Sequence, residues 1–370
     1  MATREESAFS GDPGERGRSE PPSSGGEAVR KPSIRIPILD GWRATSILCV
    51  LGAHLVPLGP KALQLNFVAG AMGMALFFCL SGFLIVQFLA GGMPVGEFLA
   101  RRLARIIPLG WGALVILFLW HQYDLPTVVR NFLFVANLPP VVMPVGGEHL
   151  WSLGVEMQFY VCVALICLVL GRRGLYLVPV LAFSVTAARV VSGERISIVT
   201  WHRIDEILAG GIIALIYAGW FGSAALERLG KLPVWPFAVG LVICSHPDAG
   251  PLQYLRPYMA ALLVGSSIGN SPALLRRVLV SRPMAYVAEV SYALYVIHGM
   301  LSATWLGTGD KLVKYLKRPL LFALTFLLAH LSTRYYEQPI TRKVRRLTSE
   351  WSKRKAAARS RSQPDAEARF

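Results

Sequence analysis

Charged residues are scarce in this chain, and their scarcity limits the class of protein it can be. Asp, Glu, Lys and Arg make up 16% of the 370 residues, whereas 54% of the residues are hydrophobic. A soluble domain usually devotes about a quarter of its residues to charge. The shortage therefore excludes a large soluble protein and indicates that much of the surface faces lipid.

Acidic residues are fewer than basic residues: 22 Asp and Glu stand against 38 Lys and Arg, which gives a net charge of +16. Much of the basic excess lies in short clusters between apolar runs and in the C-terminal tail. Basic clusters beside apolar spans typically face cytoplasmic lipid headgroups. The sequence shows no folded basic surface with base-reading elements, so we expect membrane lipid, and no nucleic acid, as a partner.

Cysteine is also rare. The chain has five cysteines, and all of them lie in apolar runs: Cys49, Cys79, Cys162, Cys167 and Cys244. None shows the spacing of a metal site, so we expect small buried hydrophobic side chains rather than disulfides or a bound metal.

Large apolar side chains are missing from residues 1–33, which are rich in Gly, Ser, Pro, Glu and Arg. This composition predicts a disordered cytoplasmic tail. The tail lacks the apolar core of a secretory signal, so we expect the first apolar span to be retained as an anchor. Residues 34–346 are predicted to form the membrane domain. Residues 347–370 are predicted to form a basic cytoplasmic tail on anionic headgroups, with no soluble domain after the spans.

Ten apolar segments are long enough, or nearly so, to cross about 30 Å of hydrocarbon as helices. They predict an all-α integral membrane protein, a bundle of about ten transmembrane helices. Residues 124–145 are apolar but broken by proline, and we interpret them as an interfacial or re-entrant connection. The ten segments run over roughly 40–59, 66–90, 104–121, 149–170, 174–192, 203–221, 233–246, 253–269, 284–306 and 318–338.

Basic residues recur at every second loop, which is the positive-inside pattern and predicts that the N-terminus and C-terminus are cytoplasmic. The outer loop "DKLVKYLKRP" (310–319) breaks the pattern. Either its late position in the chain makes this tolerable, or the local topology differs. An inverted repeat is not evident in the sequence, although such repeats can be hidden at this level.

Three titratable side chains lie within the predicted spans, where they are costly and often functional. His54 is about 16 Å along a helix from Arg43, and Glu156 is about 8 Å from Trp151, at 1.5 Å per residue. With His298 they are expected to converge in the middle and outer half of the membrane. Each is either a structural group bonded to a neighbouring helix or, for a neutral imidazole, a general base.

Two further clusters carry charge at the ends of spans. Arg102 and Arg105 are three residues apart and share a helix face, which suits bidentate binding of phosphate. The alternative is an interfacial anchor that also sets topology. Arg203 and Asp205 begin the sixth segment, where they either bind polyol hydroxyls or complement the helix dipole.

Seven motifs occur in an order that resembles the membrane acyltransferase-3 family, and together they cover about residues 36–346. They are "IPILDGWRA" (36–44) followed by His54, "FFCLSGFLI" (77–85), "RRLARIIP" (101–108), "HLWSLGVEMQFY" (149–160), "RIDEILAGGIIA" (203–214), "VSYALYVIH" (290–298) and "YYEQPITR" (335–342).

The resemblance implies a multi-pass enzyme of the bacterial inner membrane with about ten helices. Such an enzyme moves an acyl group, commonly acetyl from acetyl-CoA, onto a sugar hydroxyl of a surface polysaccharide, lipid-linked glycan or related acceptor. Acetyl-CoA is then a cosubstrate, and no permanently bound cofactor is expected. The family's motif residues fall on His54 (catalytic), Asp40, Arg43, Arg102, Arg105 and Glu156. Met157 departs from the pattern, because many members carry a second acidic residue there.

The residues and the resemblance together predict a reaction scheme. Arg102 and Arg105, with Arg43, would hold the phosphates of acyl-CoA, and His54 would accept the proton of the acceptor hydroxyl while Glu156 orients it. An acyl-histidine intermediate is an alternative to direct transfer. Supporting or acceptor-side roles fall on Asp40, Arg203, Asp205, Tyr292, Tyr295 and His298, and oxyanion donors are sought among Tyr292, Tyr295 and Ser81.

Two other functions are compatible with the pattern. A glycan exporter would also have many spans, buried charges and a proline-broken segment. A scaffold would retain the fold without activity. One local expectation is independent of this choice: Pro57 should kink the first helix or end it early.

Overall fold

The structure is a computed structural model that describes residues 36–361, with side chains as far as Lys355. The predicted tail at 1–33 and the last nine residues of the basic tail lie outside the described residues. Within the described range every regular element is a helix, which confirms the all-α class.

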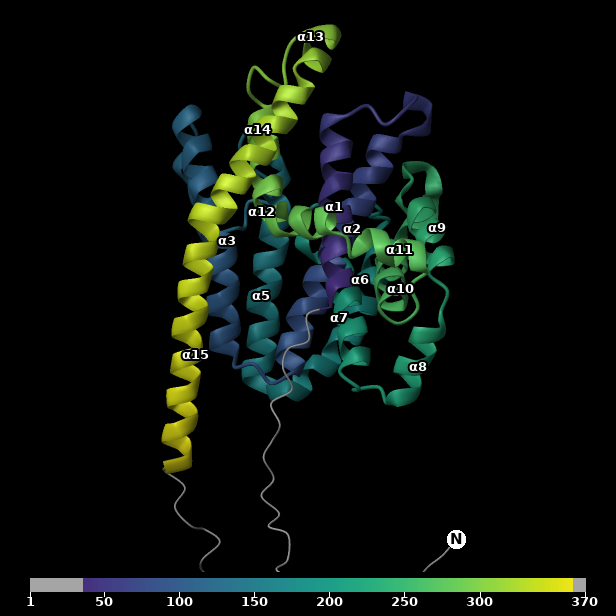
Figure 1. Cartoon of the computed structure of the whole chain (residues 1–370), viewed down its shortest axis with the longest axis vertical. Coiled ribbons are helices and arrows are strands. Elements are labelled where there is room, and N and C mark those ends of the chain that lie inside the picture. Colours follow the sequence, from purple (N-terminus) through teal and green to yellow (C-terminus); the bar gives the residue numbers. More distant parts are fainter. Residues whose placement is uncertain (1–35, 362–370) are drawn as a thin grey trace, which may run out of the picture. The chain divides into compact units, whose positions relative to one another are not determined.

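The helices follow one another along the chain, and Figure 1 shows their arrangement. They are α1 (Pro37–Leu55), η1 (Lys61–Leu63), α2 (Leu65–Ala90), α3 (Val95–Trp120), α4 (Leu125–Phe132), η2 (Glu148–Leu150), α5 (Trp151–Leu170), η3 (Gly171–Tyr176), α6 (Leu177–Ser192), η4 (Thr200–His202), α7 (Asp205–Tyr217), α8 (Ser223–Lys231), α9 (Val234–Ser245), η5 (Pro247–Leu255), α10 (Arg256–Gly269), α11 (Ala273–Leu279), α12 (Arg282–Ser302), α13 (Lys311–Leu316), α14 (Arg318–Leu331), η6 (Ser332–Glu337) and α15 (Gln338–Arg361).

Each of the ten predicted apolar segments contains a helix, but the helices differ greatly in length. Among the described residues, four helical runs are long and apolar enough to cross a membrane: Lys61–Ala90, Val95–Trp120, Glu148–Ser192 and Arg282–Ser302. A fifth results if Pro247–Gly269 and Ala273–Leu279, which meet at 101°, form one broken span. These runs are typical of a multi-pass membrane protein. The ten-span count and the side of each terminus stay predictions.

The first helix ends early, as Pro57 predicted. Helix α1 stops at Leu55, two residues before the proline, because the residue before proline is pushed out of the helical region. The Asn66 amide nitrogen of α2 donates to the carbonyls of Gly52 (3.3 Å), Ala53 (2.8 Å) and Val56 (2.5 Å). One side chain thus satisfies the exposed carbonyl end of α1, in the same turn as His54.

Helices α2 and α7 cross closely, because two glycines face the backbone of the partner helix. A Cβ at Gly82 would stand 1.7 Å from the carbonyl oxygen of Ile207, and a Cβ at Gly210 would stand 1.9 Å from that of Cys79. Small residues at a crossing let helix backbones approach in a membrane. The glycines of "FFCLSGFLI" and "RIDEILAGGIIA" therefore set this contact.

Helices α14 and α15 continue one another through the π-helical turn η6, and α15 packs along α3 (Figure 1). Polar contacts join the two helices: the Arg101 guanidinium donates to Thr348 (3.2 Å) and Ser349 (2.9 Å), and Ser352 donates to Glu97. Helical structure therefore continues into the predicted basic tail at 347–370.

Residues 124–145 do not form a long helix. Only α4, of eight residues, is regular, and the irregular turn after it carries carbonyls that need donors. The Arg130 guanidinium supplies them, because one of its nitrogens faces the carbonyls of Val135 (3.3 Å), Leu138 (2.7 Å) and Pro140 (3.1 Å). Such internal hydrogen bonds to non-helical backbone are what an interfacial or re-entrant connection requires.

The five cysteines are all unpaired, and the expectation that they are buried does not hold for Cys162. Cys79, Cys167 and Cys244 are buried and Cys49 is half-buried, whereas Cys162 is exposed on α5.

Candidate active site

A cavity with about 670 Å³ of empty volume lies among α1, α2, α3, α5 and α12. Its polar lining joins Arg43, Arg102 and Arg105 with Glu156, four residues that the sequence singled out from three separate segments. The structure therefore brings these predicted residues together. We call the part around the three arginines the arginine end.

The arginine end has more positive than negative charge. Arg43 interacts electrostatically with Arg102, Arg105 and Glu156, and it forms an ion pair of 3.3 Å with Asp40 on its own helix. The Arg102 guanidinium lies over the rings of Phe88 (5.2 Å) and Tyr160 (5.9 Å). Three guanidinium groups around one cavity suit an anion with several oxygens, such as a phosphate group.

Asp40, for which a supporting or acceptor-side role is expected, lies beside the arginine end and pairs with Arg43. It precedes Arg43 by one helical turn and pairs with it, whereas His54 lies eleven residues after Arg43 in the opposite direction along α1.

Glu156 is a buried hydrogen-bond acceptor, and its partners are two hydroxyl groups. Its Oε1 atom accepts from Ser81 at 2.6 Å and from Tyr160 at 2.5 Å. The sequence analysis did not select Tyr160, although its spacing of four residues from Glu156 puts both side chains on one face of α5. Hydrogen bonds from these hydroxyl groups and the positive charge of the nearby arginines offset the cost of burying a carboxylate here.

The second part of the site lies one turn beyond the cavity. Val50 and Tyr295 line the cavity, and His54 and His298 follow them on α1 and α12 by one turn. His54 Nδ1 and His298 Nε2 are 3.0 Å apart, so the two rings are hydrogen-bonded. We call His54 and His298 the histidine pair. His54 is exposed on its far side, whereas His298 is 0% exposed.

The contact expected between Glu156 and His54 is replaced by the contact between His54 and His298. Hydrogen bonds join Glu156 to Ser81 and Tyr160, and a separate hydrogen bond joins His54 to His298. The expected convergence of three titratable groups therefore holds for the two histidines, while Glu156 lies with the arginines. The reason is the fold: α1 packs against α12, whereas the Glu156 side chain reaches Ser81 of α2 and Tyr160 of its own helix.

A third histidine adjoins the pair, and the sequence analysis did not select it. The ring centroid of His149 is 4.7 Å from that of His298 and 5.3 Å from that of Tyr295. The signal was present, because His149 opens the motif "HLWSLGVEMQFY". Among the described residues, groups of three or more His, Cys, Asp or Glu side chains that could hold a metal ion are absent.

The hydroxyl groups considered as oxyanion donors already have acceptors within the protein. Tyr292 donates to the Ile106 carbonyl (2.6 Å), Ser81 donates to Glu156 (2.6 Å), and Tyr295 donates to the His149 carbonyl. Tyr295 also accepts from Ser152 at 2.7 Å. A role at the oxyanion, which stays a prediction, would require one of these bonds to open.

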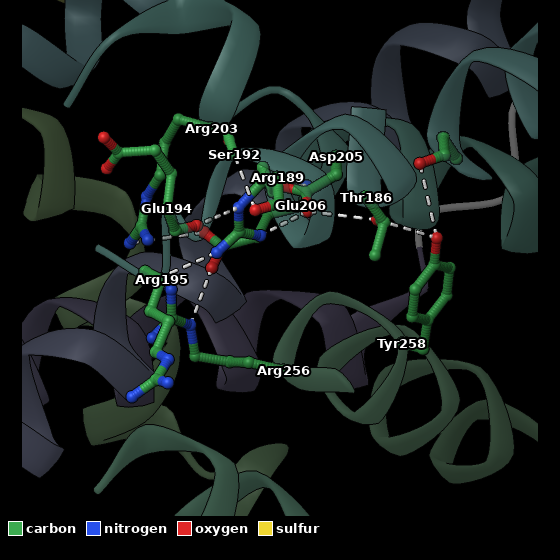
Figure 2. A network of polar contacts seen from close by, with 11 residues as sticks. Thr186, Arg189, Ser192, Glu194, Arg195, Arg203, Asp205, Glu206, Arg256 and Tyr258 are labelled. Atoms are coloured by element: carbon green, nitrogen blue, oxygen red, sulfur yellow. Dashed lines mark hydrogen bonds and ion pairs between the residues drawn. The ribbon is translucent and has the colours of Figure 1, made fainter. Parts of the chain in front are cut away.

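Arg203 and Asp205 lie in a buried ion network that does not line the cavity (Figure 2). Asp205 pairs with Arg189, and Glu206 pairs with Arg256 (2.9 Å) and Arg203 (3.5 Å). These residues come from α6, α7, the turn before α7, and α10, and the five side chains are 0–5% exposed. Charged side chains inside a membrane protein typically pair with one another. In this structure Arg203 and Asp205 form ion pairs with protein side chains, which take the place of the polyol hydroxyls that were considered as their ligands.

Comparison with known proteins identifies the family. Residues 36–333 match the acyltransferase domain of the acyltransferase-3 family. Solved structures offer no significant match to this chain.

Curated relatives are similar over most of this chain at low identity. The peptidoglycan O-acetyltransferase OatA of Listeria monocytogenes is 22% identical, over 82% of this chain and 56% of its own length. The putative peptidoglycan O-acetyltransferase YrhL of Bacillus subtilis is 25% identical, over 82% and 55%. The O-acetyltransferase OatA of Staphylococcus aureus is 23% identical, over 83% and 57%.

The chain thus spans a little over half the length of these relatives. The matches do not favour the exporter alternative. They agree with the motifs, with the helical fold and with a site made from the family's motif residues. The chain belongs to the acyltransferase-3 family.

Proposed function

We propose that this protein is a membrane O-acyltransferase of the bacterial inner membrane. It moves an acyl group, acetyl in the first instance, from acyl-CoA onto a sugar hydroxyl of a cell-envelope glycan, free or lipid-linked. One observation carries the proposal: a single cavity leads from three arginines to within one turn of a hydrogen-bonded histidine pair. Similarity to the O-acetyltransferases of Listeria monocytogenes and Staphylococcus aureus supports the same reaction class.

The arginine end is the donor side in this proposal. Arg43, Arg102 and Arg105 bind the phosphates of acyl-CoA, since guanidinium groups match phosphate oxygens bidentately. The apolar wall beyond them, with Val50, Met74 and Phe77, receives the pantetheine arm. The thioester then reaches the histidine pair.

His54 is the general base. A neutral imidazole nitrogen of His54 takes the proton of the acceptor hydroxyl while the oxygen bonds to the thioester carbonyl carbon. When the tetrahedral intermediate collapses, the carbon–sulfur bond breaks and the CoA thiolate takes up the proton from His54. Ester and CoA thiol are the products, and His54 returns to its neutral form. Direct transfer needs one acyl-transfer step, whereas a route through acyl-histidine would need two.

The exposed side of His54 supports an acceptor that arrives from the other direction. Because α1 ends at Leu55, the chain leaves the helix directly after His54 and gives an incoming hydroxyl a path to the ring. Donor and acceptor therefore approach the histidine from opposite ends of α1.

The base is tested with His54→Ala and His54→Gln in purified full-length protein, using acetyl-CoA as donor and chitopentaose as acceptor. We expect both variants to lose about 10²–10⁴-fold in transfer rate, which is the usual contribution of a general base. Ester formation is measured by mass spectrometry and thiol release by a colorimetric assay. Full transfer by either variant would rule out His54 as the base.

The donor site is tested by the affinity of CoA for Arg102→Ala and Arg105→Ala, measured by calorimetry. Each charge-assisted bond is worth about 1.5–3 kcal/mol, so we expect affinity to fall by about 10–100-fold per variant. Arg173→Ala is the matched control, because Arg173 is exposed and does not line the cavity. Unchanged affinity in both site variants would leave anchoring as the role of the arginines.

A further inference from the structure

The hydrogen bonds around His298 fix where its proton resides. Its Nδ1 atom faces two backbone carbonyl oxygens, those of Tyr295 (2.7 Å) and Leu294 (3.2 Å). A carbonyl oxygen only accepts, so Nδ1 must carry the hydrogen. The ring is fully buried among apolar and neutral groups, which favours the neutral form with one ring proton. Nε2 of His298 therefore presents a lone pair.

This lone pair determines the tautomer of His54. Nε2 of His298 is 3.0 Å from Nδ1 of His54. Two lone pairs at that distance would repel, so Nδ1 of His54 must donate its hydrogen. Neutral His54 then carries its own lone pair on Nε2, which is the nitrogen that remains available outside the pair. Histidine in water favours the opposite tautomer, with the proton on Nε2, so the pairing changes the chemistry of the ring.

We propose that His298 is the positioning residue of His54: it holds the His54 ring in the Nδ1–H tautomer and makes Nε2 the proton-accepting atom. The assignment of the tautomer is independent of the proposed function, and only its effect on catalysis rests on that function. His298 is 0% exposed whereas His54 is exposed, so His298 acts through His54 rather than on the substrates. It takes the place that a carboxylate has in a serine-protease triad, with a neutral acceptor in place of a charged one.

The surroundings of His298 hold its ring in this orientation. His149 packs against it, and Nε2 of His149 is 3.1 Å from the Val296 carbonyl, a contact that orients the His149 ring as a donor. The close approach depends on Gly299, because a Cβ there would stand 2.2 Å from Nδ1 and Cε1 of His149. The carbonyls that bind His298 belong to its own helix, so the acceptor atom moves only with α12.

The same arrangement stabilises His54 after it has taken the proton. The bond from Nδ1 to His298 becomes charge-assisted, and such bonds are roughly twice as strong as neutral ones. His54 also lies in the last turn of α1, where the carbonyl end of the helix favours a positive charge. Both effects act on the imidazolium and little on the neutral ring, so they lower the barrier to proton transfer.

The tautomer is measured directly by ¹⁵N NMR of histidine-labelled full-length protein in lipid nanodiscs. The chain has seven histidines, and the His54 signals are assigned by their loss in His54→Gln. In the wild type we expect a protonated Nδ1 and an unprotonated Nε2 on His54. In His298→Ala we expect the populations to shift towards the Nε2–H form. A wild-type His54 with its proton on Nε2 would overturn the proposal, whatever the activity of the protein.

The catalytic consequence is measured with His298→Ala and His298→Gln, using acetyl-CoA and chitopentaose. Glutamine can place an amide oxygen where Nε2 of His298 lies and accept the same hydrogen. We expect His298→Ala to lower kcat by about 10²–10⁴-fold, as tautomer loss does in a triad, with the KM for acetyl-CoA within about twofold of wild type. His298→Gln should recover at least tenfold of that loss.

Controls separate this inference from simple damage and from failure of the proposed function. His121→Gln alters an exposed histidine outside the site and should leave kcat unchanged. Melting temperatures identify variants that fold poorly, and the wild-type NMR result needs no variant of His298. If the tautomer is as expected but wild type transfers no acyl group, the proposed function fails and the positioning inference stands. Equal kcat for His298→Ala and wild type would overturn the catalytic part.

Discussion

At the scale of single residues, the site depends on which side chains contact one another. The sequence identified the residues of the site better than it identified their contacts. The titratable groups within apolar runs were visible as costly exceptions, so His54, Glu156 and His298 were all found. Their partners were not, because His54 and His298 are separated by 244 positions. Only the packing of α1 on α12 decides that contact. Similarly, Ser81 reaches Glu156 through the packing of α2 on α5, which periodicity does not encode, whereas Tyr160 lies four residues from Glu156 on the same helix face.

Glu156 offers a prediction at this scale. Its carboxylate adds negative charge beside three arginines, so Glu156→Gln should strengthen the binding of a polyphosphate donor. We expect CoA to bind about fivefold more tightly, equivalent to ~1 kcal/mol of relieved charge competition. The measurement is calorimetric titration with CoA in low salt and in 0.5 M salt, where screening should reduce the gain.

Tyr160→Phe serves as the comparison for that experiment, because it removes one hydrogen bond to Glu156 and leaves the charge. Its CoA affinity should stay near the wild-type value. Weaker binding by Glu156→Gln would mean that the carboxylate supports the arginines instead of competing with the donor.

At the scale of helices, the apolar runs predicted where helices occur, and every predicted segment holds one. They did not predict how long each helix is or where it bends. Helices α7 and α9 have only 13 and 12 residues, and the chain turns by 101° between α10 and α11. Apolar composition continues through such breaks, because lipid or protein surrounds both the helix and the turn. The early end of α1 had a visible local cause, Pro57.

The crossing of α2 and α7 predicts a strong response to one methyl group. Gly82→Ala and Gly210→Ala each place a Cβ against a backbone carbonyl that cannot move aside. We expect each to destabilise the protein by about 1–3 kcal/mol through overpacking. Thermal unfolding in detergent measures the effect. Gly112→Ala on α3 is the control, because a Cβ there meets no atom within 4 Å and should be neutral or stabilising.

The carbonyl end of α1 predicts a second effect at this scale. Asn66→Asp keeps the size of the side chain but turns a donor to three carbonyls into an acceptor. We expect a loss of about 1–3 kcal/mol in stability, together with a lower transfer rate, because the affected turn carries His54. Melting temperature and acyl-transfer rate are measured on the same preparation. Wild-type values for both would show that this contact does not hold the turn.

At the scale of the whole molecule, the distribution of basic residues predicts sidedness that helix geometry alone does not. An even number of spans leaves both termini on the cytoplasmic side. Fusions of a phosphatase or a fluorescent protein after residue 355 and within residues 247–250 test this arrangement in cells. We expect fluorescence from the first position and phosphatase activity from the second. The reverse result at residue 355 would require an odd number of spans.

The stacking of Phe77 on Tyr295, with centroids 5.9 Å apart, stands where the arginine end gives way to the histidine pair. A continuous file of water at this place would join the two aqueous compartments, and protons would run through it down the membrane potential. Each elementary charge that crosses dissipates roughly 2.3 kcal/mol per 100 mV. Two stacked aromatic rings at this place would interrupt such a file. Under the proposed function, this aromatic contact would let donor and acceptor meet without opening a path for protons between the two sides of the membrane.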